Sequence, residues 1–294
     1  MTDIDLERAV LEALDGLLAA LELKPLGEGH FRAHSEPDRF GRVFGGQMVA
    51  QAMYAACATV PDKPPHSLHA YFVQAGVPER PLDLDVDRAR DGRSMSARRV
   101  TVAQDGEPLL IAMVSFHDNP TEPEFAEPAP PAPGPDELPR LQDWAEKAPP
   151  QLLSRARMWV DRPPPVEMRI GEPTYFLGGS AASGPRTHWM RLPRDVGADP
   201  KLHSVLLAYA SDYLLLDMAF RSHPERVTVA SFAGFSLEHA LWLHRPASFD
   251  RWHRHTQELV AVSGDRGLVR GMIHDIDGHL VANTTQEVLV RANR

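Results

Sequence analysis

The sequence carries one structural unit twice, and this duplication limits the folds that the chain can adopt. In the first half, FGGQMVAQAMYAACATV predicts a helix over 44–60, and four β-type segments follow it. In the second half, an apolar helix predicted over 202–220 is again followed by β-type segments. The hairpin SMSARRVTVAQDGEPLLIAMVSF aligns with GLVRGMIHDIDGHLVANTTQ, so the Asp-Gly turn at 105–106 matches the one at 277–278. We therefore expect an α+β protein with two tandem antiparallel sheets, each wrapped around its own helix.

The segment between the two units has the composition of a linker. PTEPEFAEPAPPAPGPDELP contains eight prolines and little apolar periodicity, which predicts an extended, Pro-rich linker over 119–160. The first unit then covers 1–118 and begins with an amphipathic helix, whose apolar stripe runs from Leu6 to Leu21. The second unit covers 161–294.

The amino-acid composition limits which kinds of partner and which cellular compartment we expect. A formal net charge of −9 would repel nucleic acids and anionic membranes, so neither is expected as a partner. No apolar run approaches the roughly 20 residues that cross a bilayer. The single cysteine, Cys57, excludes an intramolecular disulfide and favours a reducing compartment. Because MTDIDLE lacks the features of a signal peptide, we expect a cytoplasmic protein.

The familiar nucleophile and nucleotide motifs are absent or broken. GGSAASG and GFSLE each lack the second glycine of a nucleophile elbow, which argues against a Ser-His-Asp hydrolase. No GxxxxGK[ST] phosphate loop occurs. His253 and His255 share one strand face, but no third ligand with suitable spacing follows, so we expect a solvated basic strand end and no metal site.

A cluster of arginines in RDGRSMSARR leaves two interpretations open. Arg93 and Arg98, with their neighbours, either form a hydrated sheet face with salt bridges or bind the phosphates of a nucleotide-like carrier.

Two polar residues stand out within the apolar second half. Asp212 lies inside the apolar helix, and its helical neighbours at three and four positions are Ala208, Tyr209, Leu215 and Leu216. A partner for its carboxylate must therefore come from elsewhere, and we expect it to come from the sheet. Gln286 shares its strand face with apolar residues and should point inward, whereas strand alternation alone does not place Ser236. Asp212 and Gln286 either form a buried structural hydrogen bond or activate a water molecule.

Several segments resemble the acyl-CoA thioesterase II family, bacterial enzymes and their peroxisomal relatives with a double hotdog fold. The matching segments occur in the family's order and cover most of 28–291: FRAHSEPDRFGRVFGGQMVAQAMYAA, HSLHAYFVQAG, DGRSMSARRV, LLAYASDYLLL, LEHALWLHRP and RGLVRGMIHDIDGHLVANTTQE.

The resemblance implies the hydrolysis of fatty acyl-CoA by direct attack of a water molecule, without a cofactor. It implies that Asp212, Ser236 and Gln286 are catalytic and hold that water. Backbone N–H groups at Gly45 and Gly46 are candidates for stabilising the oxyanion.

The resemblance also implies a homo-oligomer that binds acyl-CoA, with the CoA outside the core near the arginines. Two departures from the family pattern occur: Ser236 stands where Thr is frequent, and Glu238 stands where Asp is common.

Two alternatives belong to other functional classes. An enoyl-CoA hydratase on a hotdog fold would need a His paired with an acid in a hydratase-type loop, and no such pairing is evident. A catalytically weak acyl-CoA binding protein would bind the substrate tightly without releasing thiol.

Overall fold

The computed structural model describes residues 2–118, 125–222 and 233–291. In the first half the elements are α1 (Asp3–Ala20), β1 (Lys24–Gly27), β2 (His30–Ala33), α2 (Gly45–Ala58), β3 (Pro65–Phe72), β4 (Leu82–Asp91), β5 (Met95–Gln104) and β6 (Glu107–His117). A connecting region follows with η1 (Pro135–Glu137), α3 (Leu141–Glu146), η2 (Pro150–Leu152) and α4 (Leu153–Asp161). The second half contains β7 (Glu167–Ile170), η3 (Tyr175–Leu177), β8 (Arg186–Arg191), α5 (Pro200–Ser211), α6 (Leu215–Ser222), β9 (Ala233–Leu243), β10 (His253–Ser263), β11 (Arg266–Asp275) and β12 (Leu280–Arg291).

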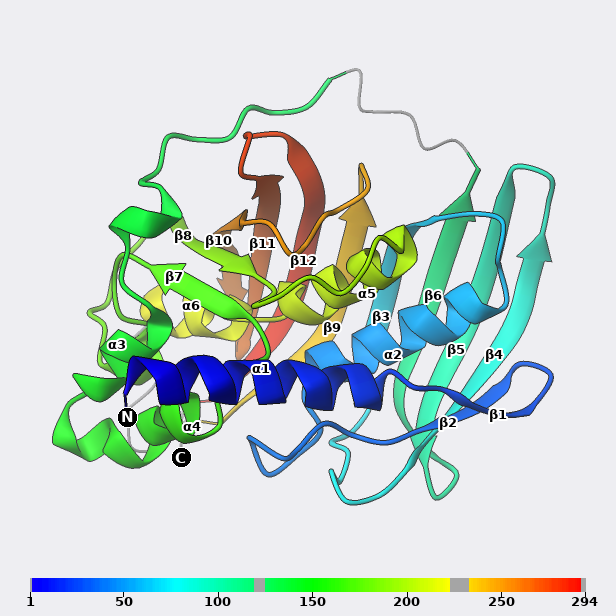
Figure 1. Cartoon of the computed structure of the whole chain (residues 1–294), viewed down its shortest axis with the longest axis horizontal. Helices are drawn as coiled ribbons and strands as arrows, with labels where there is room; N and C mark the ends of the chain where they lie inside the picture. The colour runs from blue at the N-terminus through cyan, green and yellow to red at the C-terminus, as the bar shows by residue number, and fades with distance from the viewer. Residues whose placement is uncertain (1, 119–124, 223–232, 292–294) are drawn as a thin grey trace.

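The strands form one continuous antiparallel sheet. Its order is β1-β2-β4-β5-β6-β3-β9-β12-β11-β10-β8-β7, so each half contributes its strands in the same sequence from the edge to the centre. The halves meet where β3 pairs with β9, from Ser67 opposite Trp242 to Tyr71 opposite Glu238. The helices α2 and α5 lie on the same side of this sheet, and α1 runs below α5 in this view (Figure 1). The predicted duplication is thus visible in the strand order.

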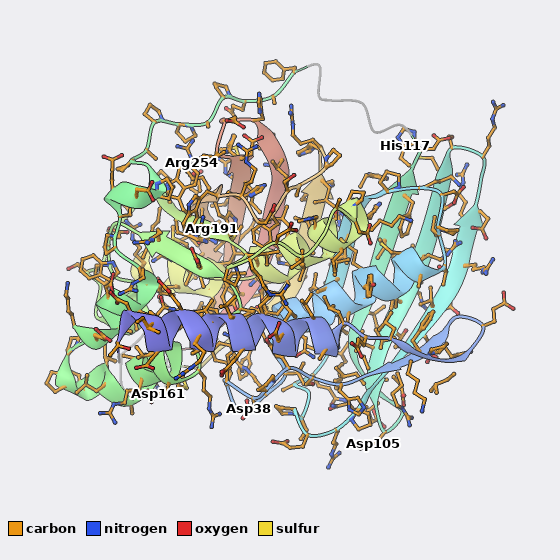
Figure 2. The ribbon with its side chains drawn as sticks, in the orientation of Figure 1. Asp38, Asp105, His117, Asp161, Arg191 and Arg254 are labelled. Atoms are coloured by element: carbon orange, nitrogen blue, oxygen red, sulfur yellow. The ribbon has the colours of Figure 1, made fainter. Side chains whose placement is uncertain are left out.

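Local sequence explains most of these elements. Buried and less buried positions alternate along β5, as expected for a strand with one face on the core. Asp105 and Gly106, in the turn between β5 and β6, both have positive φ angles, of 51° and 84°, which a two-residue hairpin turn of this type requires. This turn and His117 lie at opposite ends of β6 (Figure 2). The predicted stripe on the first helix is also present, since Leu6, Val10, Leu14 and Leu17 are buried.

Two predicted segments differ from the structure. The helix expected over 202–220 is divided into α5 and α6, and Leu214 between them adopts a left-handed conformation with φ of 67°. The expected extended linker is partly helical, because α3 and α4 lie within it or at its end. The first of the β-type segments expected after this helix, VTVASFAGFSLEHALWLHR, contains β9, and its residues 227–232 lie outside the described residues. Among the described residues no helix is long and apolar enough to cross a membrane.

A buried ion pair fixes the corner between α5 and α6. Asp217 on α6 is fully buried and accepts hydrogen bonds from Arg186 on β8 and from the backbone N–H groups of Tyr175 and Phe176, the latter two at 3.1 Å. The Arg186 guanidinium also donates to the carbonyl of Leu214 at 3.3 Å. Strand β8 therefore holds the backbone next to Asp212.

Removing this pair should be costly. We expect Asp217→Ala to lower the free energy of unfolding by about 3–5 kcal/mol, because it leaves the Arg186 charge buried without its partner. Asp277→Ala, which removes the exposed partner of Arg251, is the control and should cost less than about 1 kcal/mol. Urea unfolding of both variants measures the difference. Equal losses would contradict this role of Asp217.

Candidate active site

A cavity of about 580 Å³ lies between the beginning of α2, the corner after α5 and the inner face of β9 and β12. Its wall is mainly apolar and contains a few polar groups, a composition typical of small-molecule sites. The polar side chains in the wall are Arg42, Gln74, Arg155, Asp212, Ser236 and Gln286, with the Tyr213 ring. The apolar wall includes Phe40, Val43, Phe44, Met48, Phe72, Met158, Trp159, Phe176, Leu214, Leu216, Phe235, Leu237 and Leu289.

Asp212 is placed by the end of a helix. It is the C-cap residue of α5, and the left-handed Leu214 then turns the chain into α6. A left-handed conformation at a residue other than glycine costs free energy and is frequent at functional sites. This break lets the Asp212 carboxylate leave the helix and face the beginning of α2.

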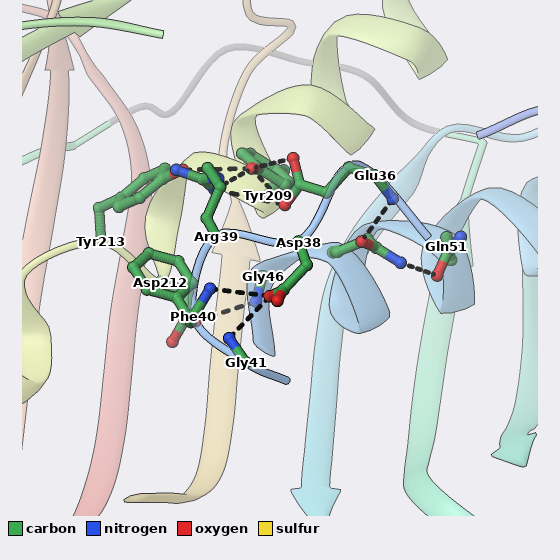
Figure 3. Close-up of polar contacts among 11 residues, drawn as sticks. Glu36, Asp38, Arg39, Phe40, Gly41, Gly46, Gln51, Tyr209, Asp212 and Tyr213 are labelled. Atoms are coloured by element: carbon green, nitrogen blue, oxygen red, sulfur yellow. Dashed lines mark hydrogen bonds and ion pairs between the residues drawn. The ribbon is translucent and has the colours of Figure 1, made fainter. Parts of the chain in front are cut away.

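The partner of Asp212 comes from the other half of the chain. The backbone N–H of Gly46, in the first turn of α2, donates to Asp212 Oδ2 at 2.9 Å (Figure 3). The first N–H groups of a helix have no partner within the helix and favour an anion. A Cβ atom at Gly46 would lie 2.3 Å from the Tyr209 carbonyl oxygen, so only glycine permits this approach. We expected the partner of Asp212 to come from the sheet, but the hydrogen bond comes from the first turn of α2.

A buried polar cluster fixes the same two segments behind the cavity. Arg39 donates to the hydroxyl groups of Tyr209 and Tyr213, both at 2.7 Å, and forms an ion pair with Glu36 (Figure 3). The Tyr213 ring stacks on Phe44, the residue before α2, with ring centroids 4.8 Å apart. The loop before α2 is therefore attached to the end of α5 on both sides of the Gly46–Asp212 contact.

Ser236 reaches the cavity through a β-bulge. Glu238 and Ser236 pair with the consecutive residues Glu287 and Val288, so Leu237 is the extra residue. The bulge places Ser236 on the inner face, and its Oγ accepts a hydrogen bond from Gln286 Nε2 at 2.9 Å. Glu238 lies beside this irregularity and accepts from the backbone N–H of Glu287 at 2.9 Å. Gln286 is fully buried, as the alternation along its strand predicted.

The two oxygens of Asp212 have different surroundings. Oδ2 is occupied by Gly46, whereas Oδ1 is buried and makes no hydrogen bond within 3.5 Å to any described residue. Burial raises the pKa of Asp212 above its usual 3.8, and the neighbouring His239, the Gly46 N–H and the Arg42 charge oppose this shift. The result is a carboxylate with one fixed oxygen and one buried oxygen that has no hydrogen-bond partner among the described residues.

The predicted site residues do not all meet here. Asp212, Ser236, Gln286 and Gly45 line the cavity, and Gly46 contacts Asp212. The cavity wall does not include Arg93 or Arg98.

The location of Arg98 excludes a phosphate contact. Its side chain is buried and donates to Thr59, at the C-terminal end of α2, and to Asp91. That end lies roughly 20 Å from Gly45, the length of a helix of this size. Arg93 is exposed in the turn between β4 and β5. Arg98 forms a salt bridge with Asp91, as one of the two interpretations expected, but its side chain is buried and not on a hydrated sheet face.

Some residues of the wall were not predicted. Arg42 lies over the Phe235 ring, and Arg155, Met158 and Trp159 come from α4, in the segment expected to be an extended linker. The sequence signal that could have indicated a helix in the cavity wall is the mixture of apolar and cationic residues in LSRARMWVD. His239, which contacts Gln286, lies within the family segment LEHALWLHRP, but the resemblance implies no role for it.

The prediction that His253 and His255 form a solvated strand end was wrong. His253 and His255 are both buried and not solvated, because β10 lies inside the sheet between β8 and β11. Among the described residues, the one cluster with metal-ligand spacing is Asp275, Asp277 and His279 at the turn after β11, where two of the three are exposed. It does not belong to the cavity.

Comparisons with known proteins agree with this geometry. Residues 158–289 match the family model described as acyl-CoA thioesterase, and residues 34–117 match the acyl-CoA thioesterase N-terminal domain. Acyl-coenzyme A thioesterase 8 of Mus musculus is 33% identical over 285 residues, covering 93% of this chain and 88% of the relative.

Two of the similar solved structures cover nearly the whole chain. The acyl-CoA thioesterase II of Mycobacterium marinum has a TM-score of 0.77 at 31% identity, covering 96% of this chain and 99% of that one. A protein with a hot dog fold from Alicyclobacillus acidocaldarius has a TM-score of 0.74 at 18% identity, covering 95% and 98%, and shows the fold alone. The predicted double hotdog fold is confirmed, and the chain belongs to the acyl-CoA thioesterase family.

Proposed function

We propose that this thioesterase hydrolyses fatty acyl-CoA by direct attack of a water molecule that Asp212 activates. The observation that carries the proposal is the unpartnered Asp212 Oδ1 inside an apolar cavity, beside Gln286 and Ser236. A buried acceptor without a partner is costly unless a ligand or water completes it. A water bound to Oδ1 would lie within reach of the Gln286 amide and the Ser236 hydroxyl.

The chemical steps require no covalent enzyme intermediate. The water oxygen attacks the thioester carbonyl carbon while Asp212 takes a proton from that water. The N–H of Gly45, at the beginning of α2, can stabilise the oxyanion, because the N–H of Gly46 is already occupied by Asp212. The tetrahedral intermediate then expels CoA thiolate, which takes the proton back from Asp212. The products are the fatty acid and the CoA thiol.

The acyl chain fits the apolar part of the cavity. The aromatic rings of Phe72 and Trp159 and the side chain of Met158 line it, and α4 closes one side. Burial of each methylene is worth about 0.8 kcal/mol, so this wall supplies the affinity for the chain. The arginines of the wall, Arg42 and Arg155, take the place of Arg93 and Arg98 as the proposed contacts for the charged CoA.

We also propose that the protein is cytoplasmic and forms a homo-oligomer. The acidic net charge and single cysteine support the compartment. Exposed apolar side chains gather on the outer face of β3 and β6, where Tyr71 pairs with Ile111 and Met113 lies nearby, and they support self-association.

The role of Asp212 can be tested by an isosteric change. We expect Asp212→Asn to lower kcat on medium- or long-chain acyl-CoA by at least about 100-fold, because an amide cannot accept the proton of the water. Asp87→Asn, which removes the same charge from an exposed position on β4, is the control. Thiol release measures hydrolysis, and circular dichroism checks folding. Near-normal turnover by folded Asp212→Asn would refute the mechanism, and loss of crotonyl-CoA absorbance without thiol would instead indicate a hydratase.

The charge of Arg42 should control the pH dependence. The raised pKa of Asp212 means that activity falls as pH decreases through a value above that of an ordinary aspartate. Arg42 lowers this pKa, so Arg42→Gln should move the acidic limb of the kcat/KM profile to higher pH. Arg251→Gln, at an exposed ion pair, should leave the limb unchanged. An unshifted limb in Arg42→Gln would show that another group controls it.

The wall formed by α4 should limit the length of the acyl chain. We expect Met158→Trp to lower kcat/KM for C16 acyl-CoA by about 10-fold relative to C8, because the larger ring occupies volume in the cavity. Leu153→Trp is the control, since Leu153 is exposed on the same helix and does not line the cavity. Measuring thiol release from C4 to C18 gives the profile. An equal loss at all lengths would place the acyl chain elsewhere.

A further inference from the structure

His239 on β9 connects the candidate catalytic residues to the core, and the proposed mechanism does not use it. Its side chain is fully buried. Its Nδ1 lies 2.6 Å from Gln286 Oε1, and its Nε2 lies 2.9 Å from Ser211 Oγ. Ser211 directly precedes Asp212 in the chain. One imidazole ring therefore joins the residue beside Asp212 to the far side of the Gln286 amide.

The hydrogen-bonding capacity of each group fixes the direction of this chain of contacts. The Gln286 Nε2 group can only donate, and it donates to Ser236 Oγ at 2.9 Å. The amide oxygen Oε1 then faces His239 and can only accept, so the proton of the ring lies on Nδ1.

The other ring nitrogen must then be an acceptor. Burial lowers the pKa of His239 below its usual value, against the Asp212 charge, which raises it, and the lowered pKa favours the neutral ring with a single N–H. Nε2 then carries no proton and lies 2.9 Å from Ser211 Oγ, whose hydroxyl donates to the Ala208 carbonyl oxygen at 2.8 Å. The tautomer is therefore determined by the contact with Gln286.

We propose that His239 is a positioning residue, whose Nδ1–H holds the Gln286 amide in the orientation that presents Nε2 to Ser236, Asp212 and the attacking water. An amide is nearly symmetrical in shape, and without this contact it can rotate by half a turn. The rotated amide would present its oxygen to the carboxylate, which repels it, and the water would lose a donor. This inference rests on the proposed function.

A pair of substitutions separates the two contacts of the ring. In His239→Asn, the side-chain nitrogen is bonded to Cγ, as Nδ1 is in histidine, so a donor to Gln286 can remain. In His239→Gln, the nitrogen lies one atom further out, near the place of Nε2, so contact with Ser211 can remain while the donor to Gln286 is lost. Both changes keep a buried amide on β9. His255→Asn is the control, because His255 is also fully buried but contacts Thr284 and not Gln286.

The experiment measures kcat and KM by thiol release for each variant, alone and combined with Gln286→Ala. We expect His239→Gln to lower kcat by about 10- to 100-fold with little change in KM, as for other misplacements of about 1 Å. His239→Asn should retain at least about five times the kcat of His239→Gln. With Gln286→Ala, the two His239 variants should differ by less than about twofold, because the group that they position is absent.

The opposite outcomes would overturn the inference. Equal kcat values for His239→Asn and His239→Gln would do so, and so would the same loss in His239→Gln with and without Gln286. If neither variant folds, nitrogen-15 shifts of His239 in the unmodified protein decide the matter, because a neutral ring protonated on Nε2 contradicts the proposal. Failure of the proposed function is a separate result, recognised by full turnover of Asp212→Asn and Gln286→Ala.

Discussion

The structure depends on the close contact between the beginning of α2 and the end of α5. A single hydrogen bond, from Gly46 N–H to Asp212, joins a helix of one half to the cap residue of the helix in the other. It is possible because Gly46 has no side chain to collide with the Tyr209 backbone. The cavity, the bulge at Leu237 and the Arg39 cluster are arranged around this contact. The candidate active site is therefore built between the two repeats and belongs to neither alone.

Burying the Asp212 carboxylate costs free energy, and only part of this cost is offset by its neighbours. Burial disfavours the Asp212 carboxylate, while His239, the helix N-terminus and Arg42 recover part of that cost. A fully satisfied carboxylate would be more stable, but it would have no free oxygen for a water molecule. The unpartnered Asp212 Oδ1 and the left-handed Leu214 each lower the free energy of unfolding.

Much of the fold could be predicted because it depends on local patterns. The strands follow alternation, the Asp105-Gly106 turn follows its backbone requirement, and Gln286 points inward by parity. Ser236 could not be placed, because its orientation depends on a bulge that exists only in the register with β12. The helix breaks after Asp212 at Leu214, whose carbonyl accepts a hydrogen bond from Arg186 of β8. Contacts of this kind join residues far apart in the chain, and no local pattern records them.

The pairing of β3 with β9 also bears on how such a chain could have arisen. A single repeat on its own would expose this strand edge, and two copies could cover it only after meeting in solution. Joining both copies in one polypeptide keeps the edges at a high mutual concentration and removes the need for the copies to be identical. The inner positions of β6 in the first copy, Ala112, Val114 and Phe116, are all apolar. Covalent fusion would have allowed the first copy to contribute the helix start at Gly45 and Gly46 to the cavity, while the second contributed Asp212, Ser236 and Gln286.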